Sequence, residues 1–156
     1  MTRVMAEDTV DKAALGRFLA SEAPFLQALG IVCEAVAPGY AVARWKTDAR
    51  WLRPGGLVFG GGLMTLADAA LYMAILGSLG PGAPAVTNEL KMNFLRPATG
   101  GDVLATARVL RMGKRIAYGE VHLAVADHPE RLIAHATSSY ALLSNPGGER
   151  EKGDEA

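Results

Sequence analysis

One apolar stretch, residues 55–78, constrains the fold of this chain more than any other part of the sequence. Three consecutive glycines, Gly60 to Gly62, open it, and the residues that follow are apolar for about four to five helical turns. Leucine and alanine recur at three- and four-residue spacing, which predicts a helix, and the opposite side of that helix is also mostly apolar. A helix that is apolar all round belongs in a protein interior. The sequence therefore predicts one buried helix with the rest of the chain folded around it.

Asp68 is the one charged residue within this helix. A carboxylate in apolar surroundings is costly unless it is paired or has a chemical task. Asp68 is therefore the first functional candidate in the sequence. The alternative interpretation is an aspartate that is hydrogen-bonded for structural reasons alone.

Composition excludes several classes of function. The chain has 16 basic and 16 acidic residues among 156, and no basic block points to nucleic acid or an anionic membrane as the partner. The single cysteine, Cys33, cannot form an internal disulfide, which is typical of a reducing compartment. The charged N-terminus lacks a signal-peptide core, and glycine and proline break the uncharged run 69–88, so no membrane span is predicted. We expect a cytoplasmic protein.

The order of elements predicts a single α+β domain. Asp8 and Thr9 are expected to cap a first helix, and the long loop 47–58 is expected to lead into the buried helix. After that helix nearly everything is strand, so a curved antiparallel sheet wrapped around the helix is the simplest architecture. We predict one domain over residues 1–143 and a disordered tail over 144–156. The other expected elements are a helical turn at 24–29 and strands at 31–37, 40–46, 85–95, 103–112, 116–126 and 132–143.

Three segments resemble a known family. They read FGGGLMTLADAA, then AVTNELKMNFLRPATGGDVLATARVLRMGKRIAYGEVHLAV, then LIAHATSSYALL. This order of landmarks resembles the PaaI-type acyl-CoA thioesterases of the hotdog fold, and the similarity covers roughly residues 25–143. The resemblance implies a central helix inside a curved sheet, paired subunits, and active sites at the dimer interface.

The sequence departs from that family at two positions. Members commonly read N-x-x-G-x-x-H-G-G ahead of the helix, whereas this chain has Arg53 at the asparagine position and Phe59 at the histidine position. Arg53 could donate hydrogen bonds, pair with Asp68, hold an acidic acyl group or be a solvated loop residue. Phe59 would make the acyl pocket drier or serve as a core aromatic. The retained residues are Gly56, Gly60, Gly61 and Asp68.

Gly60 and Gly61 suit an oxyanion hole. Glycine lets a ligand approach backbone N–H groups at the positive end of a helix, although tight packing at a turn would also require it. Asp68 follows Gly60 by eight residues, about 12 Å along a helix. If both groups act on one carbon, the aspartate must come from a second chain. Catalysis therefore implies a homodimer, which we expect to pair further into a dimer of dimers. There, Asp68 would orient or deprotonate water, or attack the carbonyl.

Acyl-CoA is the expected small-molecule substrate, and CoA enters as part of it rather than as a cofactor. Thr87 is a candidate hydroxyl beside the site, and Phe94 begins the FLRPA strand end. Phosphates of CoA bind cationic groups and backbone N–H groups, although charged hairpin ends also serve solubility. The candidates for this role are Arg96, Arg111, Gly113, Lys114 and Arg115.

Other chemistries lack their patterns. His122, His128 and His135 form no HExxH or Cys/His cluster, so the sequence predicts no metal site, and no G-x-S-x-G or P-loop is present. The leading hypothesis is an acyl-CoA thioesterase. The second is a non-catalytic hotdog protein that binds acyl-CoA or a related ligand. A hotdog hydratase ranks last, because no histidine lies near Asp68 in sequence.

Overall fold

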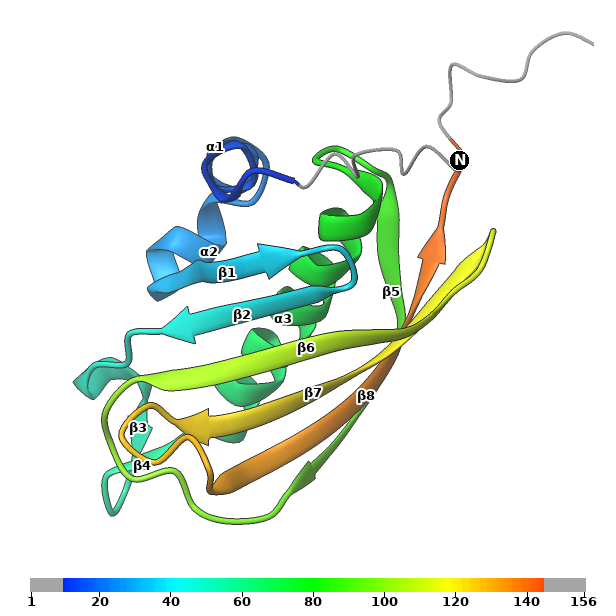
Figure 1. The fold of residues 1–156 in the computed structure, drawn as a ribbon. Helices are drawn as coiled ribbons and strands as arrows, with labels where there is room; N and C mark the ends of the chain where they lie inside the picture. The colour runs from blue at the N-terminus through cyan, green and yellow to red at the C-terminus, as the bar shows by residue number, and fades with distance from the viewer. Residues whose placement is uncertain (1–9, 145–156) are drawn as a thin grey trace, which may run out of the picture.

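Helix α3 (Gly60–Leu79) lies inside the curve of a six-stranded antiparallel sheet in the computed structural model (Figure 1). The structure describes residues 10–144. The strand order is β1-β2-β6-β7-β8-β5. This arrangement confirms the predicted fold class. The remaining elements are α1 (Lys12–Glu22), α2 (Pro24–Leu29), β1 (Ile31–Ala37), β2 (Tyr40–Trp45), η1 (Ala49–Trp51), β3 (Leu52–Arg53), β4 (Leu57–Val58), β5 (Ala85–Phe94), β6 (Val103–Met112), β7 (Ile116–Val125) and β8 (Leu132–Leu142).

The sheet strands end within one residue of their predicted limits, whereas the predicted start of the first helix and the predicted loop need correction. Helix α1 begins at Lys12, because the Asp11 side chain accepts a hydrogen bond from the Ala13 amide at 3.1 Å and caps it. The predicted caps Asp8 and Thr9 lie outside the described residues, as does the tail beyond residue 144. The expected loop 47–58 contains η1 and the short β3–β4 pair.

Small side chains let the sheet close around α3. A Cβ at Gly119 of β7 would stand 2.6 Å from the Arg108 carbonyl oxygen and closer still to Leu71 of α3. The helix therefore packs directly on the backbone of the sheet at this point. The concave face is lined largely by buried alanines: Ala41, Ala43, Ala105, Ala107, Ala117, Ala134 and Ala136.

Irregular register bends the sheet around the helix. The β1–β2 pairing shifts between Cys33 and Ala35, the β5–β8 pairing between Thr87 and Glu89, and further shifts interrupt β6–β7 and β7–β8. Each bulge adds local twist and bends its strand. The bends allow six strands to curve around one helix.

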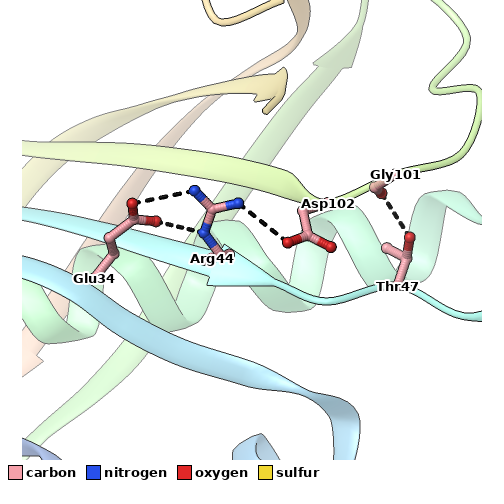
Figure 2. A network of polar contacts seen from close by, with 5 residues as sticks. All are labelled: Glu34, Arg44, Thr47, Gly101 and Asp102. Atoms are coloured by element: carbon pink, nitrogen blue, oxygen red, sulfur yellow. Dashed lines mark hydrogen bonds and ion pairs between the residues drawn. The ribbon is translucent and has the colours of Figure 1, made fainter. Parts of the chain in front are cut away.

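A polar network ties the first strands together on the outer face. The Arg44 guanidinium of β2 donates to Glu34 of β1 at 2.7 and 3.1 Å and to Asp102, ahead of β6, at 3.1 Å (Figure 2). Nearby, Thr47 Oγ1 donates to the Gly101 carbonyl oxygen at 2.6 Å. Three neighbouring segments are thus joined at the rim of the sheet.

The two edges of the sheet differ in their surroundings. Helices α1 and α2 lie beside β1 (Figure 1). Strand β5 forms the other edge, ten residues long and mostly exposed, and within the described chain it pairs only with β8. A long edge strand presents unpaired N–H and C=O groups that a second chain can bind.

Between its exposed ends, helix α3 is buried except along one side. Thr65, Asp68 and Tyr72 follow one another along it and are only half-buried. Among the described residues it is the one helix whose length and composition would suit a membrane span, and 67% of its apolar window is buried inside the protein.

Candidate active site

Asp68 is held by two hydroxyl groups. Thr87 Oγ1 donates to Asp68 Oδ1 at 2.7 Å, and the Tyr140 hydroxyl donates to the same oxygen at 2.5 Å. The Tyr140 hydroxyl also lies 2.9 Å from the Asp68 carbonyl oxygen. No described residue makes a hydrogen bond with the second carboxylate oxygen, Oδ2. One oxygen of the carboxylate is therefore fixed, and the other can accept a proton or a water molecule.

Sheet register brings the two hydroxyl groups together. Thr87 of β5 lies directly opposite Tyr140 of β8, next to the bulge in β5. Tyr140 points inward and is 2% exposed, and its ring stacks on Tyr72 of α3 with centroids 6.1 Å apart. The structure thus places the predicted residue Thr87 beside Asp68. Sequence reasoning missed Tyr140; its only signal was an inward position in the alternating pattern of the last strand.

Tyr140 is a permanent hydrogen-bond donor. Burial raises the pKa of Tyr140 far above its ordinary value, and the charge of Asp68 and the hydrogen bond to it raise that pKa further. The phenol therefore stays protonated at any physiological pH and cannot act as a base. Its hydroxyl can donate to the carboxylate and so hold Oδ1 in place.

A pocket of about 360 Å³ opens in front of Asp68. Its walls come from α1, α2, α3, β5 and β8, and most of them are apolar, as is usual for a pocket that binds a small molecule. Phe25 and Glu22 at its rim were not predicted. The lining residues are Glu22, Ala23, Phe25, Leu26, Thr65, Asp68, Ala69, Tyr72, Ala85, Val86, Thr87 and Tyr140.

Gly60 and Gly61 are the first two residues of α3, and their amides have no hydrogen-bond acceptor among the described residues. The amide of Gly62 donates to the Phe59 carbonyl oxygen at 3.1 Å. Phe59 occupies the N-cap position but has no side chain that could satisfy the free amides. The positive end of α3 is therefore available to an anion or a polarised carbonyl oxygen.

A second pocket, of about 460 Å³, lies at this end of α3. The structure brings four predicted residues together in its lining: Arg53, Gly60, Phe94 and Arg96. A Cβ at Gly60 would stand 3.2 Å from the Phe94 ring, so that close approach favours glycine. Asp68 is absent from this lining. Within one chain, the acid and the free amides therefore face different pockets.

Phe59 lines neither of these pockets. Its ring stacks on Trp51 and meets the edge of Trp45, with centroids 6.1 Å apart in both pairs. A Cβ at Gly62 would stand 2.6 Å from the Phe59 ring, so packing of these aromatics explains the third glycine. Phe59 therefore packs against both tryptophans while 36% of its surface stays exposed.

The predicted CoA-binding cations do not gather in one place. Arg111, Lys114 and Arg115 are exposed on or beside the β6–β7 hairpin, where the Gly113 amide donates to the Ile116 carbonyl oxygen at 2.9 Å. This hairpin lies at the end of the sheet near the start of β5 (Figure 1). Arg96 follows the other end of β5 and donates to the Leu132 carbonyl oxygen at 2.7 Å.

Comparison with known proteins assigns the class. The helix-in-sheet arrangement is shared with zebrafish thioesterase superfamily member 2, at a TM-score of 0.74 and 28% identity over 86% of this chain and 99% of that one. The family model of the thioesterase superfamily matches residues 55–131. The fold is therefore that of a hotdog thioesterase.

Curated relatives define the branch. The chain is 34% identical over 109 residues to the acyl-coenzyme A thioesterase PaaI of Escherichia coli, covering 69% of this chain and 74% of that protein. It is 34% identical over 101 residues to human acyl-coenzyme A thioesterase 13, covering 64% of this chain and 71% of that protein. The chain belongs to the thioesterase superfamily, in its PaaI-type branch.

Proposed function

We propose that this protein hydrolyses acyl-CoA thioesters, with Asp68 as the general base. The observation that carries the proposal is the Asp68 carboxylate itself: Thr87 and Tyr140 fix Oδ1, and Oδ2 has no partner in the described chain. A base needs this combination of fixed orientation and one accessible oxygen. The names of the curated relatives, acyl-coenzyme A thioesterases, agree with this chemistry.

The reaction proceeds through a tetrahedral intermediate. A water molecule transfers a proton to Asp68 Oδ2 as its oxygen attacks the thioester carbonyl carbon. The amides of Gly60 and Gly61 stabilise the negative charge that develops on the carbonyl oxygen. The C–S bond then breaks, the CoA thiolate takes up the proton held by Asp68, and the carboxylic acid and the regenerated Asp68 carboxylate remain. The reaction needs water as its only co-reactant.

A two-fold dimer through β5 would join the two half-sites. Helix α3 and β5 run in opposite directions, because Gly60 lies against Phe94 at the end of β5 and Asp68 binds Thr87 near its start. Antiparallel pairing of β5 with a second β5 reverses the partner strand. The free amides of one chain then come to the Asp68 end of the other. The long exposed edge of β5 supports this arrangement.

The same pairing accounts for the separated cations. The β6–β7 hairpin is at the Asp68 end of its own sheet and Arg96 is at the opposite end. Reversal of the partner therefore brings Lys114 and Arg115 of one chain toward Arg96 of the other. Cations from both chains would then bind the phosphates of a single CoA. The acyl group would enter the pocket beside Phe25 and Tyr72, which favours apolar or aromatic acids.

Substitution of Asp68→Asn tests the base. Asparagine keeps an oxygen for the two hydroxyl donors but cannot accept the proton, so kcat is expected to fall about 10²- to 10⁴-fold. Asp127→Asn, on the exposed β7–β8 turn, is the matched control and is expected to keep full turnover. Release of CoA thiol from a panel of acyl-CoA esters gives the rates. Wild-type turnover by Asp68→Asn would exclude the mechanism, and CoA-ester binding without turnover by the wild type would select the binding-protein alternative.

Mixing two inactive variants tests the dimeric site. Asp68→Asn removes the base, and Gly60→Val obstructs the amides at the other half-site. If each site combines residues of two chains, random re-association of the two variants yields one intact site in half of the dimers, or about one quarter of wild-type activity. A site contained within one chain would show no recovery, and this result would refute the dimeric arrangement while leaving the role of Asp68 intact.

A further inference from the structure

A group of metal-ligating side chains lies on the outer face of the sheet, away from α3. His122 of β7 pairs directly with His135 of β8, and Glu120 lies two residues before His122 on the same face. Each residue offers one ligand atom, and the three atoms lie within 4.8 Å of one another. Glu120 and His122 share a face because they are two residues apart on one strand, and the register of β7 with β8 brings His135 to them.

The distances suit one metal ion. His135 Nε2 lies 2.9 Å from Glu120 Oε2, and His122 Nε2 lies 3.4 Å from the same oxygen. Ligands bound tetrahedrally at about 2.0–2.1 Å stand about 3.3 Å apart, so small side-chain movements would place all three around a common centre. The two imidazole rings meet edge to face, with centroids 5.1 Å apart and an angle of 71° between their planes.

The surroundings of these three side chains leave space for a cation. A hollow of about 310 Å³ beside Glu120 and His122 leaves space for a water molecule as a further ligand. The charged group on the adjacent strand is Arg108 of β6, which lies opposite Glu120 and also lines this hollow. Its guanidinium lies over the Tyr40 ring of β2, at 5.1 Å, and is therefore turned to the strand on the other side of β6. Thr106 and Thr137, which face His122 and Glu120 across the strands, are neutral.

We propose that Glu120, His122 and His135 bind a first-row transition-metal ion, with Zn²⁺ as the most suitable. Two imidazole nitrogens and one carboxylate oxygen form a borderline ligand set that favours zinc and its neighbours over Mg²⁺ and Ca²⁺, which prefer oxygen. This proposal departs from the sequence analysis, which predicted no metal site. It is independent of the thioesterase reaction, because the group lies on the opposite face of the sheet from Asp68.

Zinc titration of the metal-free full chain by calorimetry at pH 7.5 tests the site. We expect one Zn²⁺ per chain with micromolar affinity. His135→Ala and His122→Ala are each expected to weaken binding at least 10-fold, and Glu120→Gln is a milder variant for the case that a histidine variant fails to fold. His128→Ala is the matched control: the third histidine is exposed on the β7–β8 turn and its loss is expected to leave affinity unchanged.

Cobalt and pH give two further readouts. Co²⁺ bound by these ligands is expected to show the visible absorption of a low-coordinate nitrogen–oxygen site, and this absorption is expected to vanish in His135→Ala. Zinc affinity is expected to fall from pH 7.5 to 5.5, since protons compete for the imidazoles. Failure of Zn²⁺ to bind the wild type, or equal binding by wild type and all three ligand variants, would overturn the proposal.

Discussion

Removing the Tyr140 hydroxyl gives the sharpest test of how the base is held. In Tyr140→Phe the ring can keep its stacking on Tyr72, but Asp68 Oδ1 loses its buried donor. A hydrogen bond to a charged group contributes about 1.5–3 kcal/mol. If that orientation is needed in the transition state, kcat falls about 10- to 150-fold.

Thr87→Val is the comparison variant. Thr87 donates to the same oxygen but is exposed, whereas Tyr140 is 2% exposed, so water can replace the threonine hydroxyl. We expect a smaller loss, about 3- to 10-fold, corresponding to the net value of about 1 kcal/mol for an ordinary hydrogen bond. The losses of kcat in the two single variants are not expected to multiply in the double variant, because both donors share Oδ1.

Steady-state kinetics with thiol detection, together with thermal unfolding, distinguishes an orienting role of Tyr140 from a purely structural one. An orienting role lowers kcat with little change in KM. A purely structural role lowers the melting temperature without a selective loss of kcat. If Tyr140→Phe retains wild-type kcat, or if Thr87→Val is the more damaging change, the assignment of Tyr140 as the positioning residue is wrong.

Three further predictions concern stability. Gly119→Ala would force a methyl group into the Arg108 backbone and Leu71, so we expect a loss of about 1–3 kcal/mol and a melting temperature lower by about 2–12 °C in calorimetry. Gly16→Ala is the same chemical change at an exposed position inside α1, where no atom lies within 4 Å of the added Cβ. It is expected to stabilise the fold by about 0.5–1 kcal/mol. A change of the same sign in both variants would contradict the packing argument. Hydrogen bonds from Arg44 lower the pKa of Glu34. The stabilisation that these bonds give the folded chain is therefore present above the ordinary pKa of glutamate, and it is lost as the pH falls through the lowered pKa of Glu34. Arg44→Met is therefore expected to cost about 1 kcal/mol or less in denaturant unfolding at pH 7 and less still at pH 3, and a difference that grows on acidification would refute this.

Local pattern determined most of the architecture. The strands were predictable because side chains alternate along them, α2 because Pro24 and Gly30 mark its ends, and α3 because its apolar residues follow helical spacing. The same local evidence identified Asp68 as an unusual acid in an apolar helix and Gly60 as a helix start with free amides. These inferences need only neighbouring residues, so they required no knowledge of how the chain folds back on itself.

Only the tertiary structure decided which groups meet. Tyr140 reaches Asp68 from 72 residues away, and His135 meets Glu120 from 15 residues away. Both contacts depend on strand register, and a shift of one residue would turn each side chain to the other face of the sheet. Register is set by bulges and by packing against α3, which involve the whole domain. The sequence by itself therefore determined the elements and the acid, whereas the folded sheet determined the partners that make the acid a candidate catalytic base.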